Sequence, residues 1–177
     1  MANCVLNKDL LRSTTCAYNL LEVKDIYLAN FADITSAHTD YNCESGVTLD
    51  SLVMESGASF YHIEPQKNST TYTDELVVED NGNKYRTQTI TFTVAGKYDK
   101  DMVCSVDALA LGRFFVVVKT ANGDYLALGS QTGLEASAQS IAGGGDNNGV
   151  TVTLSANVAE SAVPLGEAAI NKVLGKE

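Results

Sequence analysis

The clearest pattern in the chain is an alternation of apolar and polar residues between residues 71 and 94. Two runs, 71–80 and 84–94, meet across Asn81-Gly82-Asn83, and an Asn-Gly pair adopts positive φ at little cost. The second run places three apolar residues on one strand face and four threonines on the other: Ile90, Phe92, Val94, and Thr87, Thr89, Thr91, Thr93. We therefore predict a hairpin with a half-buried strand, whose threonine face suits solvent or a neighbouring subunit.

Other short runs of strand composition lie on both sides of this hairpin. They cover residues 23–30, 47–54, 59–63, 114–119, 125–128, 134–141 and 150–156. Two stretches have the composition of loops, the polar TSAHTDYNCESG at 35–46 and the glycine-rich GGGDNNG at 143–149.

Residues 99–111 change to a helical period. Their apolar positions recur at helical spacing, at Met102, Val106, Leu109 and Ala110. Asp99 can cap the start and Gly112 stands where a C-terminal stop belongs, so the pattern predicts one amphipathic helix laid against a sheet. After Pro164, a segment of small residues at 167–174 predicts a short helix or a tail.

These elements together predict a mainly β fold (β-rich α+β). Adjacent strands separated by turn residues favour an antiparallel β-sandwich or barrel of roughly eight strands, with one flanking α-helix at about 99–111. We expect a single domain over residues 1–177, with an N-terminal arm (about 1–15), a long hairpin arm (about 64–86) and a C-terminal tail (about 165–177).

Charge adds a further constraint. The 177 residues carry 12 Lys+Arg against 22 Asp+Glu, a net charge of -10, whereas nucleic-acid binders carry the opposite sign because phosphate contacts need cations. Two long stretches, 25–64 and 121–171, contain no Lys or Arg at all. Such a surface is either a solvated one that aids solubility, or one that a polyanion must pass without binding.

Candidate chemistry is sparse. His38 and His62 lie outside any zinc-binding spacing, and we interpret His62 as a structural histidine and His38 as a solvated loop residue. The four cysteines are too far apart for a metal or redox motif, and Cys104 is expected to be a small buried thiol of the predicted helix. No G-x-S-x-G is present, and the glycine-rich loop lacks the Lys-Ser/Thr of a phosphate loop. The sequence predicts no enzyme, no catalytic residue, no metal site and no cofactor.

Targeting signals are also lacking. No apolar run approaches the ~20 residues that span a bilayer. Charged residues interrupt the start of the chain, at Lys8, Asp9 and Arg12, where a signal peptide needs an apolar core. We expect the protein to be made and folded in a cytoplasm.

Residues 90–166 carry a distinctive order of small motifs. A strand, a helix and an apolar strand lead into a T-x-x-G hairpin, and a glycine-rich loop and a final T-x-T-L strand precede a proline. Between them stand the pairs Leu128-Gly129 and Gly133-Leu134, and VKDIYLANFADI lies near the start of the chain. Over about residues 16–166 this order resembles the tail tube (major tail) proteins found in phages and prophages of Bacteroidetes-type hosts.

The resemblance implies a β-barrel or sandwich whose copies close into hexameric rings, which stack into a hollow tube that conducts DNA. It implies a location in the virion tail after assembly in the bacterial host cytoplasm. The implied partners are further copies of the chain, with tape-measure, sheath, terminator and baseplate proteins. DNA is then only a non-sticking cargo, and neither a membrane nor a cofactor is involved.

The resemblance also assigns candidate residues. An acidic inner wall would repel DNA phosphates. The lumen candidates are the carboxylates of the first cation-free stretch, followed by two from the second: Asp25, Asp33, Asp40, Glu44, Asp50, Glu55, then Asp124 and Glu135. The inter-subunit arm candidates are the mixed charges of the hairpin region, where an ordinary surface hairpin is an equal alternative: Lys67, Asp74, Glu75, Glu79, Lys84 and Arg86.

Three other functions stay open at this point. A tail-terminator or neck protein would form a single ring of the same fold. The inner tube of a contractile injection system would use the same subunit to carry effectors. A monomeric ligand-binding β-sandwich would need an exposed aromatic platform, but the chain has no Trp and its eight tyrosines are scattered.

Overall fold

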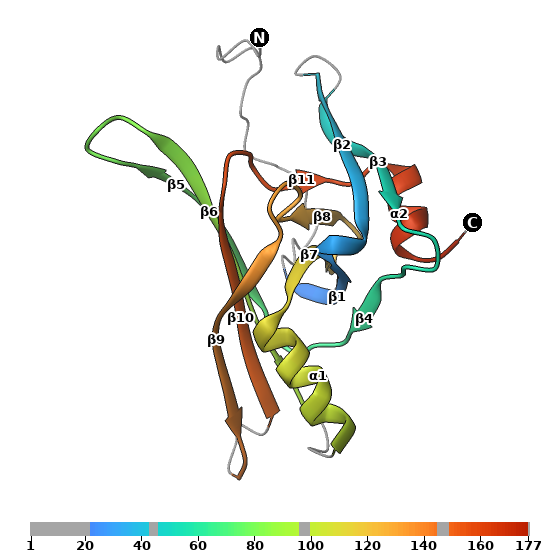
Figure 1. Ribbon diagram of the computed structural model, residues 1–177, viewed down its shortest axis with the longest axis vertical. Coiled ribbons are helices and arrows are strands. Elements are labelled where there is room, and N and C mark those ends of the chain that lie inside the picture. The colour runs from blue at the N-terminus through green and yellow to red at the C-terminus, as the bar shows by residue number, and fades with distance from the viewer. Residues whose placement is uncertain (1–21, 43–45, 96–99, 145–148, 177) are drawn as a thin grey trace, which may run out of the picture.

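The computed structural model describes residues 22–42, 46–95, 100–144 and 149–176. Within these ranges the chain forms eleven strands, two α-helices and a short 3₁₀ helix (Figure 1). In chain order they are β1 (Val23–Asn30), η1 (Phe31–Asp33), β2 (Ile34–Asn42), β3 (Gly46–Met54), β4 (Tyr61–Ile63), β5 (Thr71–Val78), β6 (Lys84–Val94), α1 (Lys100–Leu111), β7 (Arg113–Thr120), β8 (Tyr125–Leu128), β9 (Leu134–Ala142), β10 (Gly149–Val158), β11 (Val163–Pro164) and α2 (Glu167–Val173). The predicted mainly β fold with a flanking helix is confirmed.

Strand β7 is the branch point of the large antiparallel sheet. One of its edges pairs along most of its length with β1, which in turn pairs with β4. Its other edge is shared, because Arg113 and Phe114 pair with β9 while residues 116–119 pair with β8. From β9 the sheet continues through β10 and β6 to β5, and this four-stranded part forms the long ribbon that runs down one side of the molecule (Figure 1).

The apolar run of β7 is explained by burial on both faces. Phe114, Val116 and Val118 enter one hydrophobic core, and Phe115 and Val117 enter a second core on the opposite face. A strand covered on both sides loses the alternation of apolar and polar residues, and reads as a continuous apolar run.

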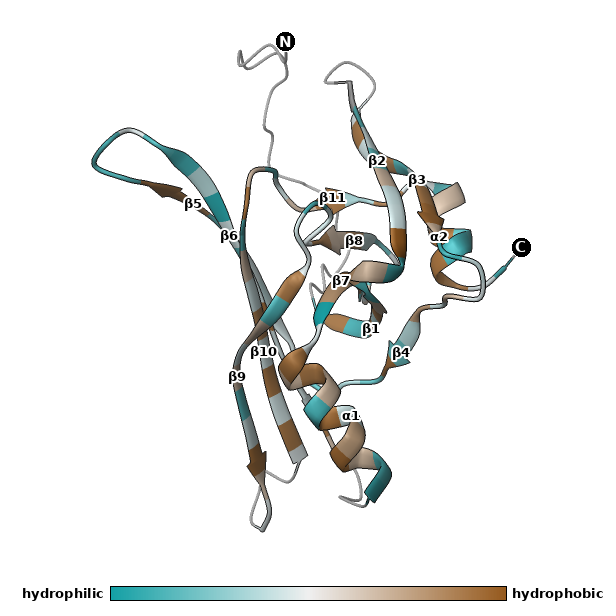
Figure 2. Ribbon diagram, viewed as in Figure 1, coloured by the Kyte–Doolittle hydropathy of each residue, from teal (hydrophilic) through white to brown (hydrophobic). Residues whose placement is uncertain are grey.

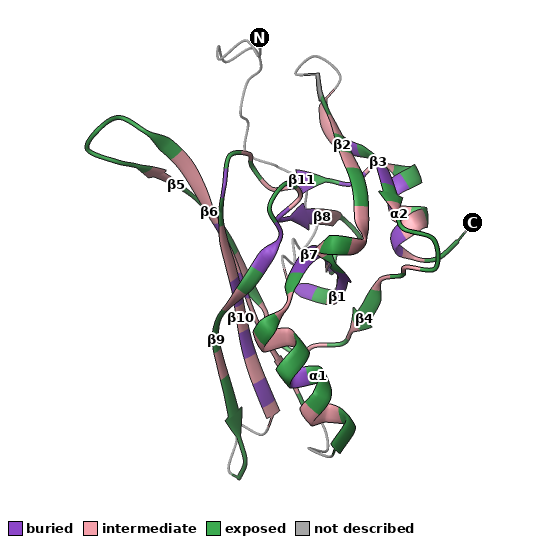
Figure 3. Cartoon of the chain, viewed as in Figure 1, coloured by how far each residue is buried: buried purple, intermediate pink, exposed green. Residues whose placement is uncertain are grey.

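The first core lies between the four-stranded ribbon and α1. Ile90 and Phe92 of β6 and Val152 and Leu154 of β10 are fully buried in it, and Val106 is the buried residue of α1. The bands of alternating hydropathy and burial along β10 make this pattern visible (Figures 2 and 3). The helix ends as predicted, with the Gly112 N–H donating to the Ala108 carbonyl at 2.8 Å.

The second core lies under the separate β2–β3 hairpin and α2. Leu49 and Leu52 of β3 pack with Ala169 and Val173 of α2 and with the far face of β7. The Gly166 N–H donates to the Leu49 carbonyl at 2.9 Å, which joins the start of α2 to β3. The predicted C-terminal helix or tail is therefore a helix that closes this core.

Several expectations from the sequence were wrong in detail. Residues 34–42 form strand β2, although 35–46 was predicted as a loop, because pairing with β3 satisfies the backbone of this polar segment and Ile34 and Ala37 pack on the second core. The chain has eleven strands within the described ranges instead of roughly eight. The two strands that no run of the sequence predicted are the polar β2 and the two-residue β11, which form because β3 and β8 pair with them. Cys104 is exposed on α1 instead of buried, since only the opposite side of the helix, at Val106, meets the sheet. The predicted N-terminal arm and cap residue Asp99 lie outside the described residues.

Candidate functional site

The outer face of the four-stranded ribbon is lined by hydroxyl side chains. Those of β6 and β10 stand directly opposite one another and hydrogen bond across the strands at 2.8–3.0 Å, in the pairs Thr87–Asn157, Thr89–Ser155, Thr91–Thr153 and Thr93–Thr151. The strand alternation puts no Lys, Arg, Asp or Glu of β6 or β10 on this face within the described residues. The predicted threonine face is thus a flat, neutral and partly exposed surface.

Both edges of this ribbon carry a long strand that lacks an outer partner. Among the described residues, no strand pairs with the outer edge of β5, and β9 has no partner on that side beyond its first two residues. The four strands alternate in direction, so β5 and β9 run opposite ways. Open edges of this kind are templates for pairing with another chain.

The β5–β6 hairpin extends beyond the ribbon as an arm. Strand β10 ends at Val158, opposite Arg86, and the hairpin continues past this point (Figure 1). At the base of the arm, Arg86 Nε donates to Asp74 Oδ1 at 2.7 Å, and Asp74 Oδ2 accepts the Ala162 N–H at 2.8 Å. These two predicted arm residues therefore hold the arm to its own subunit.

The rest of the arm is open to solvent. Glu75, Glu79 and Lys84 are exposed on the hairpin, and Lys67 is exposed in the loop that precedes it. Two apolar side chains of β5, Leu76 and Val78, are each 57% exposed, which sequence reasoning passed over. The signal that could have found them is strand alternation, since both fall on the apolar face of the hairpin, at the end where β10 stops opposite Arg86.

The predicted lumen carboxylates do not gather at one place. Asp33, Asp40, Asp50 and Glu55 lie along η1 and the β2–β3 hairpin, on the side of β7 opposite the first core. Asp124 lies in the β7–β8 turn, and Glu135 stands at the start of β9, where it accepts a hydrogen bond from Arg113 Nε at 2.7 Å. Glu44 lies outside the described residues.

Asp25 belongs to a paired cluster. Its carboxylate is 3.0 Å from His62 Nε2 and 3.5 Å from Lys119 Nζ, and the His62 ring stacks on Tyr27 with centroids 4.9 Å apart. Burial raises the pKa of the Tyr27 phenol above its ordinary value, and the nearby charge of Asp25 adds to the rise. Burial alone would lower the pKa of Lys119, but the Tyr125 hydroxyl and the Asp25 carboxylate outweigh it and hold that pKa above its ordinary value. The interpretation of His62 as a structural histidine agrees with this geometry.

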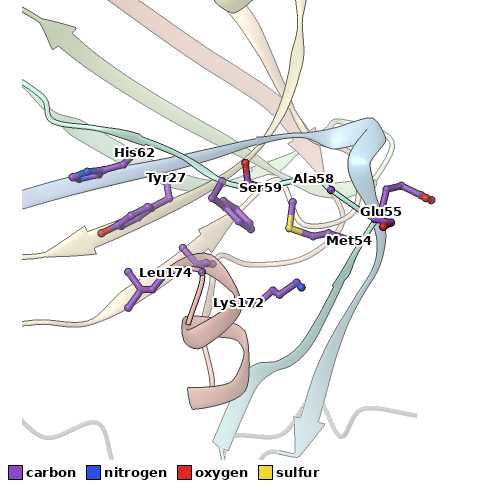
Figure 4. Close-up of a pocket in the computed structure, with 13 residues that line it drawn as sticks. Tyr27, Met54, Glu55, Ala58, Ser59, His62, Lys172 and Leu174 are labelled. Atoms are coloured by element: carbon purple, nitrogen blue, oxygen red, sulfur yellow. The ribbon is translucent and has the colours of Figure 1, made fainter. Parts of the chain in front are cut away.

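A pocket in the described part of the chain adjoins this cluster. It has a volume of about 810 Å³ and lies between the β3–β4 connection and the end of α2. Figure 4 places Tyr27 and His62 at one end and Glu55 at the other, with Lys172 reaching in from α2. His62 Nε2 is hydrogen-bonded to Asp25, and the pocket offers a mixed polar wall.

The described ranges hold neither a cluster of metal-ligating side chains nor a helix suited to cross a membrane. No group of three His, Cys, Asp or Glu side chains there is arranged to hold a metal ion. Neither of the helices there has the length and apolar character to cross a membrane.

Comparisons with known proteins give a likeness among the solved structures. No protein-family model matches the chain, and no curated protein matches it. A hybrid solid-state NMR and cryo-EM structure of the SPP1 tail tube is similar to the chain with a TM-score of 0.33 and 10% sequence identity, over 85% of this chain and 83% of that one. A likeness of this size carries no argument about fold or function, both of which rest on the chain's own residues.

Proposed function

We propose that this chain is a structural subunit of a phage tail tube, which assembles with its own copies into stacked rings around a channel for DNA. The observation that carries the proposal is the ribbon β9-β10-β6-β5, with a long open strand at each edge and a neutral hydroxyl face between them. The resemblance of the motif order in residues 90–166 to tail tube proteins points the same way.

The two open edges are complementary to each other. Because β5 and β9 run in opposite directions, β9 of one copy can pair antiparallel with β5 of the next and continue the sheet. Such a contact joins two different surfaces of identical subunits, and this kind of contact produces rings when its rotation closes. A closed ring also removes the open edges, which otherwise favour aggregation.

If the ring closes through these edges, one face of the ribbon must line the inside of the ring and the other must lie outside. One face carries α1 and the rest of the body, which is too bulky for the inside of a barrel, so it lies outside. The hydroxyl face then lines the channel. The threonine and serine side chains of β6 and β10 give DNA phosphates no ion-pair partner. Arg113, at the margin of this face, is paired with Glu135, so DNA can slide without being held.

This arrangement changes the choice of lumen residues. By strand alternation, Glu75 of β5 and Glu135 of β9 fall on the hydroxyl face, at its two margins. The carboxylates of the β2–β3 hairpin lie on the far side of the body and would face outward. We therefore retain Glu135 from the predicted lumen set, with its charge neutralised by Arg113, add Glu75, and propose a channel that is mainly neutral.

Negative-stain electron microscopy of the purified protein over a concentration series, with light scattering on the same samples, tests the proposal. Rings with a central hole, or hollow tubes, are expected. Single rings that never stack would favour a terminator or neck protein. A strict monomer at every concentration would overturn the proposal and favour the monomeric ligand-binding sandwich.

A further inference from the structure

An apolar groove lies between β4 and α1. Its floor is formed by Leu28 and Phe114, one wall by Tyr61 and Ile63, and the other by Ala108 and Leu109 of the helix, and its volume is about 350 Å³. Tyr61 is 60% exposed at its rim. In the described part of the chain, no strand pairs with the edge of β4 that faces away from β1. The groove thus offers an apolar lining next to an open strand edge.

The outer part of the hairpin arm, from Leu76 to Lys84 and called the arm tip below, has the matching chemistry. Leu76 and Val78 are two residues apart on one strand face, which separates their side chains by about 7 Å, and both stay more than half exposed. Paired apolar side chains on a protruding strand mark a contact site in a protein that is otherwise strongly acidic.

The two surfaces cannot meet within one subunit. The arm tip lies at the Lys84 end of β6, whereas α1 follows the Val94 end (Figure 1). Ten residue steps of about 3.3 Å place these ends roughly 33 Å apart. The arm of the same subunit therefore does not reach the groove, and an arm that docks there belongs to another copy.

Charge also favours this pairing. Lys84 stands opposite Val78 on the same face of the arm. Asp101 lies one helical turn before Ser105, a residue of the groove lining, so the helix places a carboxylate at the end of the groove. A docked arm would bring the lysine toward this acidic end.

We infer that the arm tip of one copy, through Leu76 and Val78, docks in the β4–α1 groove of a second copy. This inference rests on the proposed tube function and names the contact that joins successive rings. The strands of a closed barrel tilt only about 35–45° from its axis, so a contact between opposite ends of the strands runs along the tube. The contact is made by side chains on the face of the arm, so the backbone edges of β5 and β9 remain available to close each ring.

Disulfide trapping between two preparations tests the contact. In a background where the four native cysteines are serine, one preparation carries Val78→Cys and the other Ala108→Cys. The mixture is expected to form a disulfide-linked dimer on mild oxidation, whereas each preparation alone is not. The matched control replaces the groove cysteine with Val53→Cys, which is exposed on β3 away from the groove.

Microscopy of the same samples separates this inference from the proposed function. Rings or tubes with no preference for the groove cysteine over the control would overturn the docking contact and leave the tube function standing. A specific cross-link without rings would support the contact and count against ring closure. Neither rings nor a cross-link would overturn both.

A second variant fills the groove without touching the arm. Ala108→Trp is expected to raise the concentration needed for stacking about tenfold, because it excludes apolar side chains whose burial favours association. Leu111→Ser is the matched control, since Leu111 is 90% exposed on the same helix and outside the groove lining. Equal effects of the two substitutions would contradict the inference.

Discussion

Strands β7 and β5 are both eight residues long, but their surroundings are opposite. In β7 both edges are paired and three successive valines, Val116 to Val118, are fully buried. In β5 one edge has no partner among the described residues, and Leu76 and Val78 are exposed. The comparison teaches that β7 obtains its stability within one chain, whereas the surfaces of β5 are left incomplete and suit contacts with other copies.

The largest loss of stability is expected from a core substitution in β7. Phe115→Ala removes a fully buried ring from the second core and should lower the free energy of unfolding by about 3–5 kcal/mol, because a cavity remains. Chemical denaturation monitored by circular dichroism measures it. Leu76→Ala on β5 is the contrasting change and should alter subunit stability by less than about 0.5 kcal/mol. Equal losses of stability at the two sites would contradict the difference between β7 and β5.

The base of the arm should show an intermediate effect. Asp74→Ala leaves Arg86 and the Ala162 N–H without their carboxylate partner and should cost about 1–3 kcal/mol in the free energy of unfolding. The same denaturation assay measures it. Glu75→Ala, at an exposed neighbouring position of β5, serves as the control and should be close to neutral in stability. A neutral Asp74 variant would mean that the arm is not anchored by this contact.

Alkaline pH should lower the free energy of unfolding, through the titration of Lys119 on β7 and of Tyr27 on the neighbouring strand β1. The folded-state pKa values of Lys119 and Tyr27 are both raised, so the stabilisation linked to them is fully present below their ordinary values of about 10 and is lost as pH rises through the folded-state values. Thermal unfolding above about pH 10 should reveal the loss. Tyr27→Phe removes one titrating group and should reduce the decline, and an unchanged decline would contradict the assignment.

The smallest effect on stability is expected on the hydroxyl face. Thr91→Val removes the 3.0 Å hydrogen bond to Thr153 at nearly constant volume and should cost about 0.5–1.5 kcal/mol in the free energy of unfolding.

Thr91→Lys should leave the subunit folded but make assembled tubes retain DNA, because it places a cation on the channel wall. Co-sedimentation of tubes with DNA measures the retention. Lys placed at Val53, on the β2–β3 hairpin, is the control, and equal retention by both variants would show that the hydroxyl face does not line the channel.

Local chemistry in the sequence determined much of the fold. The Asn81-Gly82 turn, the alternation along β6 and the Gly112 stop each act through a few neighbouring residues, so the hairpin, its threonine face and α1 could be predicted. The same alternation already distinguished the core face of β6 from its outer face. The hairpin that carries the candidate arm could be predicted for the same reason, although its exposed apolar residues could not.

Only the tertiary structure decided which residues come together. Asp25 contacts His62, which is 37 positions away in the sequence, and Thr91 contacts Thr153, which is 62 positions away. Local periodicity does not indicate contacts over such sequence separations. The polar segment of β2 is a strand because β3 pairs with it, and β7 is buried on both faces because two cores form around it. A local pattern of apolar and polar residues reflects the backbone geometry of one segment. Burial, ion pairs and open strand edges depend instead on which strands lie next to one another, and the packing of the whole chain sets that order.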